Sequence, residues 1–169
     1  MIFVTVGTHE QPFNRLIEYI DKLKEQNVID DNIIMQTGYS TYEPKFCEWS
    51  KLYPYQKMVE LVEKADIVIT HGGPSSFIMP LQVGKVPIVV PRQLQFNEHV
   101  NNHQVEFSKA VAERQGNIIV VENIDDLKKI ILNYKNIIKS MPAEMKSNNA
   151  RFNSELEKIV EDVFKKVKK

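Results

Sequence analysis

The segment HGGPSS, residues 71–76, follows the apolar run IVIT, and its residue types are suited to holding an anion. A glycine can cap a helix that Pro74 begins, because a proline at the first helical position loses no hydrogen bond. The backbone N–H groups of Ser75 and Ser76 would then point out of the helix N-terminus, where the helix dipole favours negative charge. With the serine hydroxyls and His71 as further donors, this segment predicts a phosphate site.

A second glycine loop, TVGT, follows the first apolar run at residues 5–8. It lacks the Lys-Ser or Lys-Thr of a Walker loop, and Gly7 does not begin a GxGxxG fingerprint, so the sequence does not predict a nicotinamide or flavin cofactor. The hydroxyls of Thr5 and Thr8 and the amide of Gly7 can instead meet phosphoryl oxygens. A simple strand-to-helix turn is the alternative at each glycine. Four glycines that follow three expected strands nevertheless favour a binding site.

Polar side chains also gather in residues 90–107, VPRQLQFNEHVNNHQVEF, after a further apolar run. His99 and His103 are four residues apart and would share one helical face. The sequence offers no third ligand with zinc spacing, so we do not expect a metal. The mixture of side chains is typical of a surface that hydrogen-bonds a polyhydroxylated ligand, and a solvated helix start is the alternative. The candidate residues are Asn97, Glu98, His99, His103 and Gln104.

The elements that must position these residues alternate along the chain, which is typical of an α/β fold. The expected strands are residues 2–6, 32–36, 65–70, 87–90 and 117–121, with a further short one near 45–49. They are continuous apolar runs, which predict a parallel sheet covered on both faces. Helical periodicity runs through residues 13–23, 58–65, 98–114, 124–139 and 144–168. We therefore expect a doubly wound, mostly parallel, Rossmann-like domain with its ligand at the carboxyl ends of the strands.

Composition excludes several classes of function. The chain has 169 residues, with 22 basic and 22 acidic side chains, so it lacks the basic footprint of a nucleic-acid-binding protein. Its single cysteine, Cys47, excludes an internal disulfide. No segment reaches the roughly 20 apolar residues of a membrane span, and the start MIFVTVGT lacks the features of a signal peptide. We therefore expect a soluble, cytoplasmic protein.

The segment 139–149, KSMPAEMKSNN, indicates a boundary. It separates an expected ligand-binding domain, residues 1–140, from a C-terminal amphipathic helix, residues 141–169. Four of the last five residues are lysines, and apolar residues recur at Phe152, Leu156, Ile159, Val163 and Val167. This helix either packs on its own domain or docks a partner, and the sequence leaves both open.

The order VTVGT, THGGPSS, GKVPIVVPR and NEHVNNHQVEF resembles the glycosyltransferase family 28 C-terminal domain, the nucleotide-sugar-binding half of a GT-B transferase. The resemblance covers residues 1 to about 121. It is nearest to stand-alone members of the family. These are the PssE-type subunits of exopolysaccharide and capsule synthesis, and the related catalytic subunit of the two-part GlcNAc transferase of N-glycan assembly.

The resemblance implies roles for the residues singled out above. It implies that the two glycine loops face a donor diphosphate, through Thr5, Gly7, Thr8, His71, Gly72, Gly73, Ser75 and Ser76. It implies that the polar group from Asn97 to Gln104 holds the hydroxyls of the donor sugar. Many relatives place a glutamate eight residues after the histidine to bind ribose. Here that position is Met79, so a ribose contact must come from elsewhere.

The implied activity is inverting, metal-independent transfer of a sugar from a UDP-sugar to a lipid-linked saccharide. UDP-galactose is the first candidate donor, UDP-GlcNAc and UDP-glucose come next, and no cofactor is expected. A membrane-anchored PssD-type partner would bind the acceptor and hold this chain at the inner face of the cytoplasmic membrane. His9 is the local candidate for the catalytic base, unless the base lies on the partner. The alternatives are a non-catalytic nucleotide-sugar-binding module and, ranked last, a nucleotide-sugar epimerase.

Overall fold

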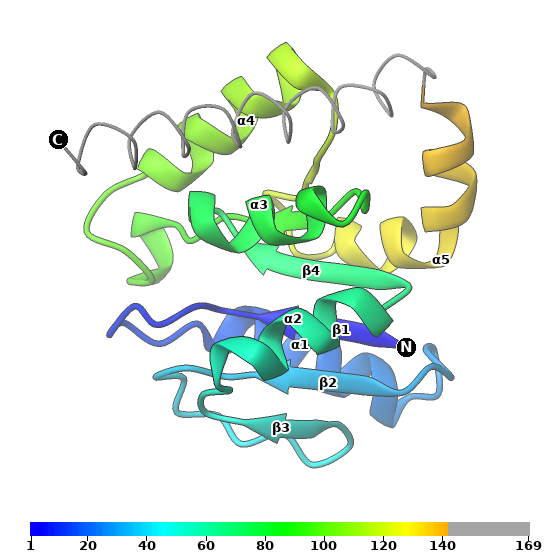
Figure 1. Ribbon diagram of the computed structural model, residues 1–169. Coiled ribbons are helices and arrows are strands. Elements are labelled where there is room, and N and C mark those ends of the chain that lie inside the picture. The colour runs from blue at the N-terminus through cyan, green and yellow to red at the C-terminus, as the bar shows by residue number, and fades with distance from the viewer. Residues whose placement is uncertain (142–169) are drawn as a thin grey trace, which may run out of the picture.

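A six-stranded sheet forms the centre of the computed structural model, which describes residues 1–141 (Figure 1). Its strands are β1 (Ile2–Thr5), β2 (Ile33–Gln36), β3 (Glu48–Ser50), β4 (Ile67–His71), β5 (Ile88–Val90) and β6 (Ile119–Val120). They pair in the order β3-β2-β1-β4-β5-β6, and every pair is parallel. The doubly wound, Rossmann-like sheet expected from the apolar runs is therefore confirmed.

Helices follow the strands and cover both faces of the sheet (Figure 1). They are α1 (Asn14–Glu25), α2 (Tyr55–Lys64), α3 (Pro74–Gln82), α4 (His103–Gln115) and α5 (Asp126–Ser140), with a 3-10 turn, η1 (Leu94–Phe96). Alternate residues of each strand serve opposite faces. Ile2 and Val4 belong to a cluster with α1 and α5, whereas Phe3 belongs to a second cluster with α2. A third cluster joins Val89 of β5 to α3 and α4.

The strand order places the two glycine loops side by side. β1 lies between β2 and β4. After β1 the chain forms β2 and β3 on one side of it, and then β4, β5 and β6 on the other side. Thr5 is paired with Thr70, which brings Gly7 next to His71 just beyond the strand ends. Ligands of open parallel sheets bind at this reversal of strand order, outside the carboxyl ends of the strands.

The predicted start of one helix is wrong. Residues 98–114 were expected to be helical, but α4 begins at His103, and residues 97–102 form a loop after η1. Asn97 has a left-handed backbone conformation with φ 56°, which a continuing helix does not allow. The side chain of Asn101 accepts a hydrogen bond from the His103 N–H, and that of Asn102 accepts one from the Leu94 N–H. Such asparagine bonds stabilise the loop in preference to a further helical turn.

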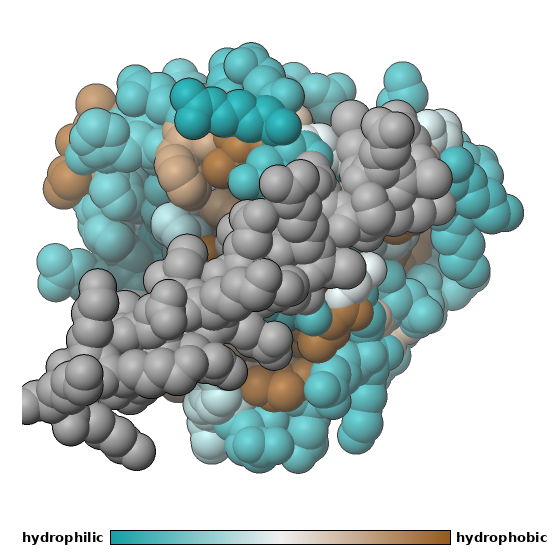
Figure 2. All heavy atoms as spheres, turned by 45° about the horizontal axis from the view of Figure 1, so that its top comes forward, coloured by the Kyte–Doolittle hydropathy of each residue, from teal (hydrophilic) through white to brown (hydrophobic). Residues whose placement is uncertain are grey.

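Where described residues are visible in Figure 2, they are mostly hydrophilic, with several hydrophobic areas among them. Within residues 1–141, no helix is long and apolar enough to span a membrane. The expected C-terminal helix lies outside the described residues, so the boundary between residues 1–140 and 141–169 stays a prediction.

A buried carboxylate on α1 organises the segment before β3. Asp21 is fully buried and accepts hydrogen bonds from the N–H groups of Lys45 and Phe46, both at 2.9 Å, and from the Tyr42 hydroxyl at 2.8 Å. Burial raises the pKa of Asp21, but these donors outweigh it and bring the pKa below its usual value. The charged carboxylate therefore stabilises the folded loop at neutral pH, and this contribution is lost as the pH falls through the lowered pKa.

We predict that Asp21→Asn lowers the free energy of unfolding by about 2–3 kcal/mol at pH 7, because an amide cannot accept all three bonds and its NH₂ group meets backbone donors. Urea unfolding monitored by circular dichroism measures this change. Glu25→Gln, an exposed carboxylate on the same helix, is the matched control. Equal midpoints for the two variants would contradict the prediction.

Candidate functional site

The two glycine loops line one hollow at the carboxyl ends of β1 and β4, with a volume of about 730 Å³. The structure brings together here most of the residues expected to face a diphosphate, and His9 with them. Those that line the hollow are Thr5, Gly7, Thr8, His9, His71, Ser75 and Ser76.

The His71 side chain is buried between the two glycine loops. A side chain at Gly7 or at Gly73 would collide with the imidazole ring, so both positions must remain glycine while the ring lies there. The Gly73 N–H donates to Nδ1 of His71 at 3.0 Å. Because Nδ1 accepts, the ring proton of neutral His71 is on Nε2, which donates to the Ser76 hydroxyl at 2.7 Å. Both ring nitrogens are thus engaged within the protein, so neither is left to contact a ligand directly.

His71 is a neutral group at physiological pH. Burial is the main cause that lowers its pKa, and the nearby Arg92 guanidinium lowers it further, to about 4. A neutral ring keeps the tautomer that orients Ser76. With its oxygen accepting from His71, the Ser76 hydroxyl can direct its own proton toward a ligand.

The N-terminus of α3 supplies further donors to the same hollow. Gly73 occupies the N-cap position and Pro74 the first helical position, as expected from the sequence. The Ser76 N–H is bonded to the Gly73 carbonyl at 3.0 Å, but the Ser75 N–H has no acceptor in the described part of the chain. The Ser75 N–H and the Ser76 hydroxyl therefore remain for an anion at the positive end of the helix dipole.

The loop after β1 plays a different part from the one expected. The Thr5 hydroxyl accepts hydrogen bonds from the Gly7 N–H at 3.2 Å and from the Gln36 side chain at 3.4 Å. The Gly7 amide is therefore already engaged, and Thr5 is buried. Thr8 is exposed at the rim of the hollow, where its hydroxyl can reach a ligand.

Sequence reasoning missed Arg92, which is fully buried. Its guanidinium donates to the carbonyls of Val6 at 2.9 Å, Gln11 at 2.7 Å and Glu98 at 3.1 Å, and lies over the ring of Phe13. Burial lowers its pKa to about 10, and it therefore remains charged at neutral pH. The signal available in the sequence was a lone arginine directly after the apolar run PIVVP.

Two residues expected to hold a sugar are placed elsewhere. Glu98 is 2% exposed and forms a two-point ion pair with Arg15, at 2.8 and 2.9 Å, and it also accepts from the Gln93 N–H. Its carboxylate is therefore used inside the protein. Asn97 lies in the exposed turn before Glu98. It lines neither the first hollow nor a second hollow that lies next to it.

The remaining sugar candidates line a second hollow of about 620 Å³, together with Gly72 and Gly73. These candidates are His99, His103 and Gln104. The Gln104 carbonyl oxygen accepts from the Gly72 N–H at 3.0 Å and from the Arg92 N–H at 3.2 Å, so it joins the ends of β4 and β5. His99 precedes α4, and it therefore does not share a helical face with His103 as expected.

His9 lies where the two hollows approach each other, with its ring centroid 4.8 Å from that of His99. Its pKa is lowered by burial first and by Arg92 next. The Gln11 N–H donates to Nδ1 of His9 at 3.2 Å, which leaves the proton of the neutral ring on Nε2. In this tautomer the free nitrogen of His9 is a donor, so a role as proton acceptor requires the tautomer to change.

Part of the lining of the first hollow is apolar. Met79, at the position where a glutamate was expected in many relatives, lies there with Tyr53, Tyr55, Met58 and Ile78. Such a surface suits the flat face of an aromatic ring. Gln36 reaches the same hollow, but its side-chain carbonyl oxygen is bonded to the Tyr53 N–H.

We predict that His71 makes folding stability depend on pH. Its pKa is about 4 in the folded chain and near 6.5 when unfolded, so its contribution is complete above pH 6.5 and is lost as the pH falls toward 4. Between pH 6.5 and pH 4 the free energy of unfolding of the wild type should fall by up to about 3 kcal/mol more than that of His71→Asn. Urea unfolding at pH 7 and at pH 4.5 measures the difference. His103→Asn, an exposed histidine, is the control, and parallel pH profiles for wild type and His71→Asn would refute the assignment.

Comparison with solved structures shows the same architecture in glycosyltransferases. The glycotransferase of kitacinnamycin matches 92% of this chain with a TM-score of 0.65 and 18% identity, and the match covers 39% of that chain. The spinosyn forosaminyltransferase SpnP matches 99% of this chain with a TM-score of 0.63 and 16% identity, over 43% of its own length. MurG of Acinetobacter baumannii matches 88% with a TM-score of 0.57 and 17% identity, over 44% of its length. The fold is therefore that of one half of a GT-B glycosyltransferase.

Sequence comparison identifies the family. The human UDP-N-acetylglucosamine transferase subunit ALG13 is 36% identical over 118 residues, which is 64% of this chain and 10% of that protein. The mouse subunit of the same name is 29% identical over 116 residues. The chain thus spans about a tenth of the length of these relatives. The model of the glycosyltransferase family 28 C-terminal domain matches residues 1–163, and the chain belongs to this family of glycosyltransferase domains.

Proposed function

We propose that this chain binds a nucleoside diphosphate sugar across the segment HGGPSS. The observation that carries this proposal is that residues 71–76 separate two adjoining hollows of different character. On one side are the anion donors Ser75 and Ser76, next to an apolar wall. On the other side are His99, His103 and Gln104. A diphosphate at the N-terminus of α3 would place a nucleobase against the apolar wall and a sugar in the second hollow.

The proposed diphosphate contacts are the Ser75 N–H and the hydroxyls of Ser75, Ser76 and Thr8. Arg92 adds a buried positive charge close to both loops. Its electrostatic effect reaches the site, because it lowers the pKa of both His9 and His71. Such a fixed charge is weakly screened because water is excluded around it. His71, Gly7 and Gly73 hold Ser76 in position and do not themselves contact the phosphates.

We propose that the base is uracil, with Tyr53, Tyr55, Met58 and Met79 packing against it. The support for uridine is the resemblance of the sequence to UDP-sugar transferases, and the name of the human relative, a UDP-N-acetylglucosamine transferase subunit. UDP-GlcNAc, UDP-galactose and UDP-glucose are the candidate donors. The sugar contacts that the geometry favours are His99 and His103, and we leave Glu98 out because Arg15 and the Gln93 N–H hold its carboxylate.

The proposed reaction is direct, inverting displacement. An acceptor hydroxyl loses its proton to a base and forms a bond to the anomeric carbon, while the bond from that carbon to the phosphate oxygen breaks and the nucleoside diphosphate leaves. Donors fixed at the helix N-terminus stabilise the charge that grows on the leaving group, and this stabilisation needs no metal ion from the protein. No cofactor is part of the proposal.

We propose that a second subunit completes the enzyme. The chain covers only 39–44% of the solved glycosyltransferases that share its fold, and the human relative is named a subunit. A membrane-anchored PssD-type subunit would bind a lipid-linked saccharide in exopolysaccharide or capsule synthesis, supply the catalytic base, and hold this chain on the cytoplasmic side of the membrane. His9 is the base that this chain itself could offer after a change of tautomer.

One observation favours a second candidate, a non-catalytic nucleotide-sugar-binding module. His9 in its present tautomer offers a hydrogen-bond donor, not a proton acceptor, to the hollow. A module of this kind would bind the donor but would give neither transfer nor hydrolysis when the partner is added. The two candidates therefore separate in an assay with the partner present.

We predict that UDP and a UDP-sugar stabilise the chain in a thermal-shift panel of UDP, UDP-galactose, UDP-glucose, UDP-GlcNAc, GDP-mannose and TDP-sugars. A ligand at a hundred times its Kd adds about 2.7 kcal/mol, which corresponds to roughly 5–10 °C for a domain of this size. Ser76→Ala should weaken binding about tenfold through one lost bond to phosphate, and His71→Ala should weaken it more because the whole loop loses its support.

Ser140→Ala, at the end of α5, is the matched control and should leave donor binding unchanged. Stabilisation by a guanosine nucleotide alone would refute the uridine assignment. If both loop variants bind UDP as tightly as the wild type, residues 71–76 are only a turn.

We predict that the purified chain transfers little sugar by itself and that transfer appears when membranes containing the partner and its lipid-linked acceptor are added. Incorporation of radiolabelled sugar into the lipid fraction measures this. Full turnover by the isolated chain would contradict the two-subunit proposal.

A further inference from the structure

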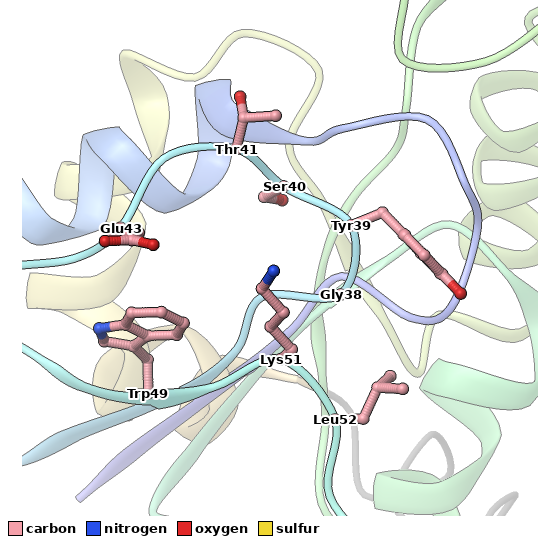
Figure 3. Close-up of a pocket in the computed structure, with 8 residues that line it drawn as sticks. All are labelled: Gly38, Tyr39, Ser40, Thr41, Glu43, Trp49, Lys51 and Leu52. Atoms are coloured by element: carbon pink, nitrogen blue, oxygen red, sulfur yellow. The ribbon is translucent and has the colours of Figure 1, made fainter.

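We propose that this chain carries a second carbohydrate site, separate from the donor pocket, at the carboxyl ends of β2 and β3. A hollow of about 400 Å³ lies there, formed by the segment after β2 and the end of β3 (Figure 3). Its ligand would be a neutral saccharide. Trp49, Lys51, Glu43 and Thr41 are the side chains that would recognise it.

The aromatic wall of this hollow is held in a fixed orientation. Trp49 is half-buried, and its indole N–H donates to the Pro44 carbonyl at 3.0 Å. The negative face of an aromatic ring attracts weakly positive hydrogens, and the C–H groups on one side of a sugar ring present such hydrogens. In Figure 3, Trp49 borders one side of the hollow and Tyr39 the other, with the Lys51 amine between them.

The charged groups of the hollow are free to bind a ligand and point to its chemistry. Neither the Lys51 amine nor the Glu43 carboxylate has an ion-pair or hydrogen-bond partner within residues 1–141. Thr41 accepts from the Asn14 side chain at 2.7 Å and keeps its own proton to donate. Sugar hydroxyls both donate and accept, and so they can satisfy an amine, a carboxylate and a hydroxyl together. A phosphate would be repelled by Glu43, and an apolar ligand would leave all three groups unsatisfied.

Residues 38–47, which form most of the hollow, are organised before any ligand binds. The Asn14 side chain accepts from the N–H groups of Thr41 and Tyr42 at 2.9 and 3.1 Å, and Asp21 fixes the following residues. The Ser40 hydroxyl accepts from the Phe13 N–H at 3.2 Å. Phe13, Asn14 and Asp21, which lie on or next to α1, therefore hold this exposed loop in a single conformation. A loop that is already ordered loses less conformational entropy when a ligand binds.

The hollow adjoins the donor pocket. Leu52 lines both, and Gly38 packs against the carbonyl of Gly7 in the first glycine loop. If the donor proposal holds, the natural occupant is the saccharide portion of an acceptor whose lipid portion the partner subunit binds. The carbohydrate site itself does not depend on transfer, since its residues are distinct from those that would hold the diphosphate.

Trp49 makes the test specific, because it is the only tryptophan of the chain. Lactose and cellobiose, titrated into the full-length protein, should each change the tryptophan fluorescence saturably with a Kd in the millimolar range, and glycerol at the same concentrations should not. Lys51→Met and Glu43→Gln should each weaken this response about tenfold or more, as expected for one lost hydrogen bond to a charged group. Lys128→Met, an exposed lysine on α5, is the matched control and should respond like the wild type.

The outcomes distinguish this proposal from the donor site. A response to disaccharide that persists in Ser76→Ala supports the carbohydrate site, even if UDP gives no thermal shift and the donor proposal fails. The proposal is overturned if neither disaccharide changes the fluorescence saturably, or if the response is equal in Lys51→Met, Glu43→Gln and wild type. It is also overturned if UDP alone reproduces the change, because the hollow then belongs to the donor pocket. Both substitutions are at exposed positions, and unchanged thermal unfolding confirms that the variants are folded.

Discussion

The Arg92 guanidinium is the interaction on which the rest of the site depends. It connects the loop after β1 with the segment after β5 by donating to carbonyls of both, across the end of the intervening β4. A buried cation loses its hydration, and this cost must be offset by several bonds at once. Three carbonyls and the ring of Phe13 provide that compensation. The arrangement keeps Gly7 beside His71, and it places a permanent positive charge where solvent does not reach it.

The polar residues at this end of the sheet are of two kinds. Some form hydrogen bonds that connect segments of the protein, and others remain exposed where a ligand could bind. Glu98, Gln104 and Thr5 accept backbone or side-chain donors of neighbouring segments. Ser75, Thr8 and His103 are exposed at the hollows. His71 links the two groups, because it is fixed by one and orients Ser76 in the other. The same division recurs near β3, where Asn14 and Asp21 hold the loop that presents Glu43 to the hollow lined by Trp49 and Lys51.

The fold was predictable from the sequence because its strands are continuous apolar runs and its turns carry glycines. The helix start at Gly73 and Pro74 was predictable because it rests on local backbone preferences. The start of α4 was not, since it depends on the side chains of Asn101 and Asn102 bonding within the loop. The burial of Glu98 could not be predicted from the sequence either. Its partner Arg15 is 83 residues away in sequence, and residue type alone does not tell a carboxylate that binds a ligand from one that pairs inside the protein.

The packing of His71 between two glycines has an evolutionary consequence. A methyl group at either glycine meets the ring, and a smaller side chain at position 71 leaves space beside both. Positions 7, 71 and 73 are therefore expected to vary together, although the first two are 64 positions apart in the sequence. Among relatives, a histidine at the end of this strand should occur with both glycines, and a change at one of the three positions should be accompanied by changes at the others.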